Sequence, residues 1–84
     1  MARHDNMGLQ NEYSERDFQM LFQQTNADGW TRAIDWLRSD GYQQLAPGHA
    51  ERMLLDLQKL QDQNAHFVRD PRQVYVMAKQ HRVQ

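Results

Sequence analysis

Four histidines, His4, His49, His66 and His81, are the residues of this chain best suited to hold a metal ion or to move a proton. A zinc site needs three or four converging ligands, and one helix supplies two of them when its histidines lie four residues apart. No pair of histidines here has that spacing. Two histidines have a nearby carboxylate in sequence, His49 with Glu51 and His66 with Asp62, as chance alone would give. We therefore expect neither a metal site nor a cofactor.

Covalent catalysis would need an activated nucleophile, and the candidates are few. The chain contains no cysteine, which excludes disulfides, thiolate nucleophiles and cysteine-bound zinc. Its two serines, Ser14 and Ser39, stand where the start and the end of a helix are expected. No glycine-rich phosphate loop is present, because each internal glycine has a turn or a helix start to explain it. We therefore predict that the protein is not an enzyme.

The aromatic residues indicate binding rather than catalysis. Trp30 and Trp36 fall within one short predicted helix, and Tyr42 follows it. Most of this aromatic surface is expected in the core, but one helix face hides two tryptophans with difficulty. Trp and Tyr dominate the residues that carry binding energy at protein interfaces. Trp30, Trp36 and Tyr42 are therefore the candidate anchors for a protein partner.

The composition describes one small domain. The chain has 84 residues, 39 % of them apolar and 25 % charged, and its mean hydropathy is −0.98. Because apolar material is scarce, we expect a partner to help stability, with a homo-oligomer as one alternative. No apolar run is long enough to cross a membrane, and the first 13 residues lack the apolar core of a secretion signal. We expect a cytoplasmic protein.

Three helices can be placed from capping residues and apolar periodicity, after a flexible N-terminal arm over residues 1–13. The first helix begins at Ser14, with Asp17 completing a capping box, and the second spans residues 29–40. Gly41 should close the second helix in the left-handed conformation, with Tyr42 packed back on it. The third helix opens near Pro47 and ends near Asn64, with Asp56 on its outer face beside Arg52. The predicted core residues of this single compact domain, residues 14–84, are Phe18, Leu21, Phe22, Ile34, Leu37, Met53, Leu57 and Leu60.

The segment after Asn64 supports two structures. Asp70 and Pro71 form a good helix start, followed by Val74, Met77, Ala78 and His81 on one face. Residues 66–68 and 74–76 are instead rich in residues that favour strands, with a polar loop between them. The fold class is therefore mainly α, with three helices and either a C-terminal β-hairpin, which we slightly favour, or a fourth helix.

The hairpin alternative resembles the winged-helix family. The apolar spacing of residues 53, 57 and 60, then Asn64 and a β-prone segment, is similar to that family's recognition helix and wing. The resemblance implies that His49 and Arg52 face the major groove of DNA, and that Arg69 and Arg72 touch phosphates from the wing. Residues 47–84 sum to +2, whereas residues 1–46 sum to −3. This sequence departs from the family in having Asn64 where a glycine is usual.

Two functions from different classes follow. The first is a small non-enzymatic protein that binds another protein as an adaptor, inhibitor or regulator, of the kind that phages and plasmids carry. The second is a winged-helix-like transcriptional regulator that binds DNA. A helical tail with an aromatic patch or an acidic face would favour the first, and a hairpin with a basic face on the third helix would favour the second.

Overall fold

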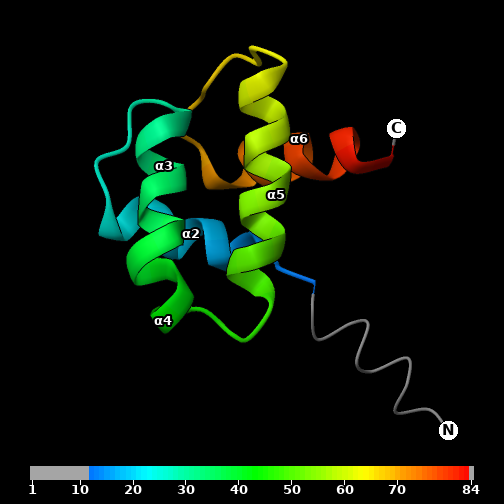
Figure 1. Cartoon of the computed structure of the whole chain (residues 1–84). Helices are drawn as coiled ribbons and strands as arrows, with labels where there is room; N and C mark the ends of the chain where they lie inside the picture. The colour runs from blue at the N-terminus through cyan, green and yellow to red at the C-terminus, as the bar shows by residue number, and fades with distance from the viewer. Residues whose placement is uncertain (1–11, 84) are drawn as a thin grey trace, which may run out of the picture.

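The chain folds into helices that form two crossed layers (Figure 1). The structure, a computed structural model, describes residues 12–83, and within this range it contains helices and no strands. The helical segments are α2 (Glu15–Gln24), α3 (Trp30–Trp36), the π-helical η1 (Leu37–Gly41), α4 (Tyr42–Gln44), α5 (His49–Asp62) and α6 (Pro71–Val83). Because α3, η1 and α4 follow one another without a break, they act as one helix. The described chain therefore has four helices, and the prediction of a mainly helical fold is confirmed.

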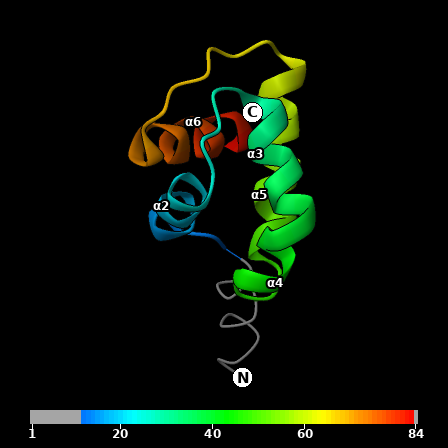
Figure 2. The ribbon, with the colours of Figure 1, turned by 90° about the vertical axis from the view of Figure 1, so that its left-hand side faces the viewer.

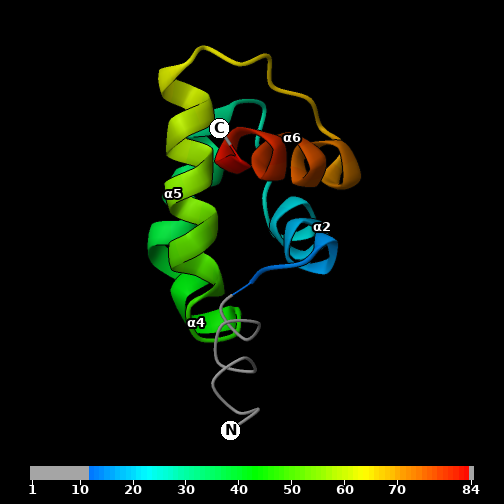
Figure 3. The same ribbon diagram turned by 90° about the vertical axis from the view of Figure 1, so that its right-hand side faces the viewer.

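The two layers each consist of a helix pair. The continuous helix formed by α3, η1 and α4 lies alongside α5, and α2 lies alongside α6 (Figures 1 and 2). Seen from the side, α2 and α6 run across α5 and close one side of it (Figure 3). No helix among residues 12–83 is both long enough and apolar enough to span a membrane.

The C-terminal segment is a helix, so the hairpin prediction is wrong. The Asp70 carboxylate accepts hydrogen bonds from the backbone N–H groups of Arg72 at 3.1 Å and Gln73 at 3.5 Å, as a helix cap does. Val74 and Ala78, four residues apart, are both buried against the core. The capping residues therefore outweigh the strand preference of Val74 and its neighbours, because the helix buries the same valine while satisfying its own backbone groups.

The second helix does not end at Gly41, which corrects another prediction. Gly41 has φ −58° and ψ −39°, which is right-handed helical geometry, and the chain continues as a helix to Gln44. The left-handed glycine is Gly48, with φ 87°, directly before α5. A β-carbon at Gly41 would lie 3.2 Å from the Leu37 side chain and 3.2 Å from Trp36. Glycine thus stands here for close packing inside a helix rather than for a turn.

The predictions for the C-terminal end and for the outer face of the third helix have different outcomes. Its C-terminal end is confirmed, because Asn64 adopts φ 58° and the Ala65 N–H donates to the Leu60 carbonyl at 3.0 Å. Its outer face is partly wrong, since Asp56 is only 3 % exposed. Asp56 does not point outward beside Arg52; it binds Tyr13 and Arg82 from other parts of the chain.

The expected flexible arm also needs correction at its end. Residues 1–11 lie outside the described residues, and the prediction for them is not addressed. Tyr13 is 2 % exposed, and its ring packs edge-on against Phe18 at 5.3 Å between ring centres. Glu12 forms ion pairs with Lys79 and Arg82. Both residues belong to the folded unit, because Tyr13 fills the space between α2, α5 and α6.

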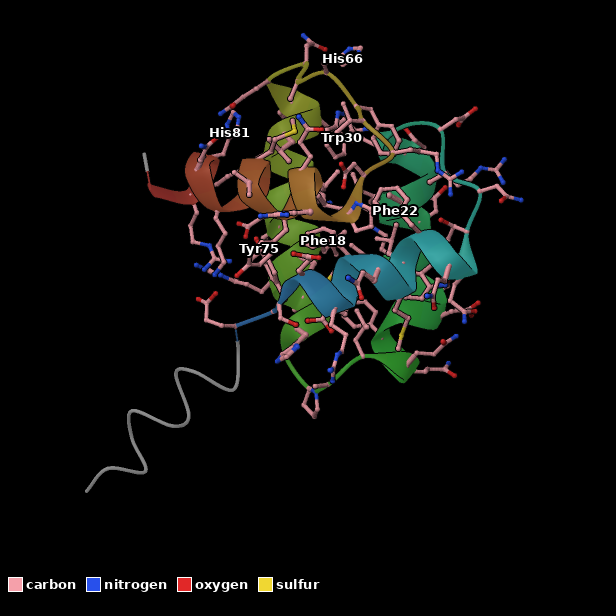
Figure 4. All side chains as sticks on the ribbon, turned by 180° about the vertical axis from the view of Figure 1, so that it is seen from behind. Phe18, Phe22, Trp30, His66, Tyr75 and His81 are labelled. Carbon is pink, nitrogen blue, oxygen red and sulfur yellow. The ribbon has the colours of Figure 1, made fainter. Side chains whose placement is uncertain are left out.

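The core follows the predicted apolar positions closely. Of the predicted core residues, all are buried except Phe22, which is half-buried and packs on Phe67. Figure 4 shows Phe18 and Tyr75 between α2 and α6, Phe22 next to α2, and Trp30 farther from α2, near the connection between α5 and α6. The complete set of buried apolar residues among those described is Tyr13, Phe18, Leu21, Ala27, Trp30, Ala33, Ile34, Trp36, Leu37, Leu45, Ala50, Met53, Leu57, Leu60, Val74 and Ala78.

Candidate functional site

An open hollow of about 810 Å³ lies where α2 ends and α3 begins. Its lining comes from residues 24–26, 28–32, 35, 36 and 39, and it mixes polar with apolar atoms. Residues of the connection between α2 and α3, which Figure 1 shows, form part of this lining. Thr25 ends α2 there, because its hydroxyl donates to the Leu21 carbonyl at 2.9 Å and its backbone is extended. We call this feature the α2–α3 hollow.

Two tryptophans line the α2–α3 hollow, and they differ in hydrogen bonding. Trp30 is 8 % exposed, and its indole Nε1–H donates to the Ala65 carbonyl at 2.7 Å. Trp36 is 7 % exposed, and its buried Nε1–H has no hydrogen-bond partner among the described residues. A buried donor that lacks an acceptor costs about 1–3 kcal/mol. Since most buried polar groups are paired, such an atom calls for an explanation.

The charged residues of the α2–α3 hollow make it slightly acidic. Asp28 and Asp35 line it and are exposed, and Arg32 is the only cation in its lining. None of these three takes part in an ion pair within the described part of the chain. The formal charge of the lining is therefore −1, and its carboxylates are available to a cation from outside.

The three predicted protein-binding residues do not form one group. Trp30 and Trp36 share the α2–α3 hollow, whereas Tyr42 lies outside its lining, in α4, and is 47 % exposed. Both tryptophans also contribute to the core. The periodicity of the second helix could indicate their helix face, but not the unsatisfied indole of Trp36, which depends on contacts between helices.

The four predicted DNA-binding residues lie in two pairs, His49 and Arg52 at the start of α5 and Arg69 and Arg72 around the start of α6. The Nδ1 of His49 lies 3.0 Å from the Asp17 carboxylate, and both side chains are largely buried. Arg52 lines a smaller hollow together with Glu12, beside the last turns of α6. Arg72 lies in the first turn of α6, about 15 Å away along that helix axis. Arg69 rests on the Phe22 ring, 5.5 Å from its centre.

A second polar cluster, which the sequence did not reveal, joins the start of the described chain to α5 and α6. The Tyr13 hydroxyl donates to Asp56 at 2.6 Å, and Arg82 donates to Asp56 at 2.7 Å and to Glu12 at 2.6 Å. Burial raises the pKa of the Tyr13 hydroxyl, and the Asp56 carboxylate raises it further, so Tyr13 remains a donor. Hydrogen bonds from Arg82 and Lys79 lower the pKa of Glu12 from 4.5 to about 2.

The hydrogen bonds and ion pairs of this cluster hold distant segments of the chain together. Each carboxylate in it is already bound by a cation or a hydroxyl of the same chain. Over residues 12–83, no group of three or more histidine, aspartate or glutamate side chains is placed to hold a metal ion. His81 carries the other buried atom without a partner among the described side chains, its Nδ1, and it lies on α6 outside the lining of the α2–α3 hollow.

Comparison with known proteins adds no relative: no family model, curated protein or solved structure matches this chain.

Proposed function

We propose that this is a small non-enzymatic protein that binds another protein through the α2–α3 hollow. The observation that carries the proposal is the buried Nε1–H of Trp36, which lacks an acceptor in a residue that lines an open hollow. A main-chain carbonyl of a partner would supply that acceptor. The cost of the unpaired donor is present only in the free protein, so its removal favours the bound state.

The surroundings of Trp36 support a macromolecular partner. Small-molecule pockets enclose most of their ligand and are mainly apolar. The α2–α3 hollow is open to solvent along one side, and polar groups make up a large part of its lining. A tryptophan surrounded by polar residues is typical of the anchor positions at protein interfaces.

Access to Nε1 requires a small rearrangement, because the atom is covered in the free protein. Arg32 and Ser39 both line the hollow and are exposed. Side-chain rotations of this size are common at interfaces whose backbone hardly moves.

Photo-crosslinking in the native host tests which surface meets the partner. A photoreactive phenylalanine derivative is placed either at Gln24, which lines the hollow, or at Gln80, an exposed residue on α6. We expect one defined protein to be crosslinked from Gln24 and not from Gln80. Equal crosslinking from both sites, or crosslinking from Gln80 alone, would contradict the proposal.

A further inference from the structure

We infer that the segment held in the α2–α3 hollow is a flexible peptide that carries a lysine or an arginine. This inference rests on the proposed function and adds the chemistry of the partner. It combines two observations, the unpaired indole donor of Trp36 and the unpaired carboxylates of Asp28 and Asp35.

The N–H donor of Trp36 requires a hydrogen-bond acceptor in the ligand, which the main chain of a peptide provides. An indole N–H can only donate, so its partner must offer an acceptor such as a peptide carbonyl. The indole of Trp30, which lines the same hollow, already has its acceptor in the Ala65 carbonyl. Of the two indole donors in the lining residues, only that of Trp36 lacks an acceptor among the described residues, and it meets a ligand only after the side chains that cover it move.

The carboxylates of Asp28 and Asp35 favour a positively charged side chain in the peptide. Asp28 lies in the connection before α3, and Asp35 lies on the exposed side of α3. Neither has a cationic partner in residues 12–83, and the hollow carries a net negative charge. A basic side chain of the peptide would gain two favourable charge contacts there, and an acidic one would be repelled.

Arg32 limits how many basic residues the bound peptide can carry, but it does not remove the preference for one. It is exposed and lines the same hollow as the two aspartates, yet forms no ion pair with them in the described structure. Its charge disfavours a ligand with several cations close together. We therefore expect a single basic residue flanked by uncharged ones.

The test uses blocked pentapeptides as probes, with lysine, norleucine or glutamate between pairs of alanines. Each peptide is titrated into ¹⁵N-labelled full-length protein, and the indole N–H signals of Trp36 and Trp30 are followed by NMR. The Trp30 signal gives a comparison within the same hollow, because its N–H already has an acceptor and should shift less than that of Trp36. The lysine peptide should shift the Trp36 signal most and bind several-fold more tightly than the norleucine peptide.

Matched variants identify the charge contacts. Asp28→Asn and Asp35→Asn should each weaken binding of the lysine peptide roughly two- to fivefold, as expected for exposed charge pairs. Asp40→Asn changes an exposed aspartate that does not line the hollow, and it should have no effect.

Two results are decisive against the inference, and they are distinguishable. Equal affinity for the lysine and norleucine peptides would overturn the basic preference while leaving the hollow as a peptide site. If no peptide shifts the Trp36 signal at millimolar concentration, the proposed function fails together with the inference.

Discussion

Among the described residues, Asp56 is the charged residue that the fold buries. It is 3 % exposed, and it accepts hydrogen bonds from the Tyr13 hydroxyl and from Arg82. We expect Tyr13→Phe to lower the free energy of unfolding by about 1.5–3 kcal/mol, the range for a hydrogen bond to a charged group. Urea denaturation measures this change.

A second tyrosine provides the control for that substitution. Tyr75 packs against Tyr13 and Phe18, but its hydroxyl forms no hydrogen bond with the described residues. Tyr75→Phe should therefore leave the urea midpoint nearly unchanged. Equal effects of the two substitutions would show that the Tyr13 hydroxyl bond contributes nothing specific.

Glu12 makes stability depend on acid pH. Its pKa is about 2 in the folded protein, against an ordinary value of 4.5, because Arg82 and Lys79 bind its charged form. Between these two pKa values the unfolded chain binds more protons, so stability falls as the pH falls. The contribution of Glu12 is complete above about pH 4.5 and is lost as the pH drops towards 2.

The variant Glu12→Gln isolates this effect from the other carboxylates. We expect the urea midpoint of the wild-type protein to fall more steeply between pH 5 and pH 2 than that of Glu12→Gln. Parallel pH profiles for the two proteins would mean that the ion pairs of Glu12 with Arg82 and Lys79 do not stabilise the fold.

At the scale of the helices, the packing around Gly41, and not its backbone conformation, limits which residue fits there. Its backbone is ordinary right-handed helix, so a side chain there meets no strain in φ. Space is what limits it, because an added β-carbon would lie 3.2 Å from Trp36 and from Leu37. We expect Gly41→Val to destabilise the fold by about 1–3 kcal/mol, the usual cost of overpacking.

Gly29 is the control position, because a side chain added there has space. Its backbone is extended, and an added β-carbon would meet nothing within 4 Å. Gly29→Ser should change the thermal midpoint little, since serine is also a favoured residue at a helix start. The packing explanation would be contradicted if Gly41→Val were as well tolerated as Gly29→Ser.

The two faces of α5 test its register. Leu57 is 1 % exposed, whereas Leu55 on the same helix is 53 % exposed. Leu57→Ala should cost about 2–5 kcal/mol through the lost burial and the cavity left behind. Leu55→Ala should cost little, and comparable losses in urea denaturation would contradict the register.

The sequence was sufficient to predict the structure where interactions within one short segment determine it. The Asp17 carboxylate accepts from the Ser14 N–H at 2.8 Å, and Asn64 takes the left-handed conformation, both as capping rules predict. The sequence was insufficient where contacts between distant segments determine the structure. The burial of Asp56 depends on Tyr13, 43 residues earlier, and on Arg82, 26 residues later. The candidate site divides in the same way, because periodicity indicates two tryptophans on one helix but not which indole lacks an acceptor.

For the whole molecule, the two crossed layers explain where the proposed binding surface lies. The helix pairs bury their apolar faces against each other, and the polar cluster around Asp56 fastens the start of the described chain to α5 and α6 (Figure 3). The α2–α3 hollow lies where the chain crosses from one layer to the other. Trp36 belongs to both features, since it packs in the core and lines the hollow.

The most direct test of this account is the affinity of the crosslinked partner for Trp36→Phe, measured by calorimetry against the wild-type protein. Phenylalanine keeps an aromatic ring but removes the N–H, so we expect affinity to fall roughly three- to tenfold, the value of about one hydrogen bond. Tyr42→Phe, which removes an exposed hydroxyl outside the hollow, should bind as the wild type does. Unchanged affinity in a correctly folded Trp36→Phe would contradict the central claim that this indole binds the partner.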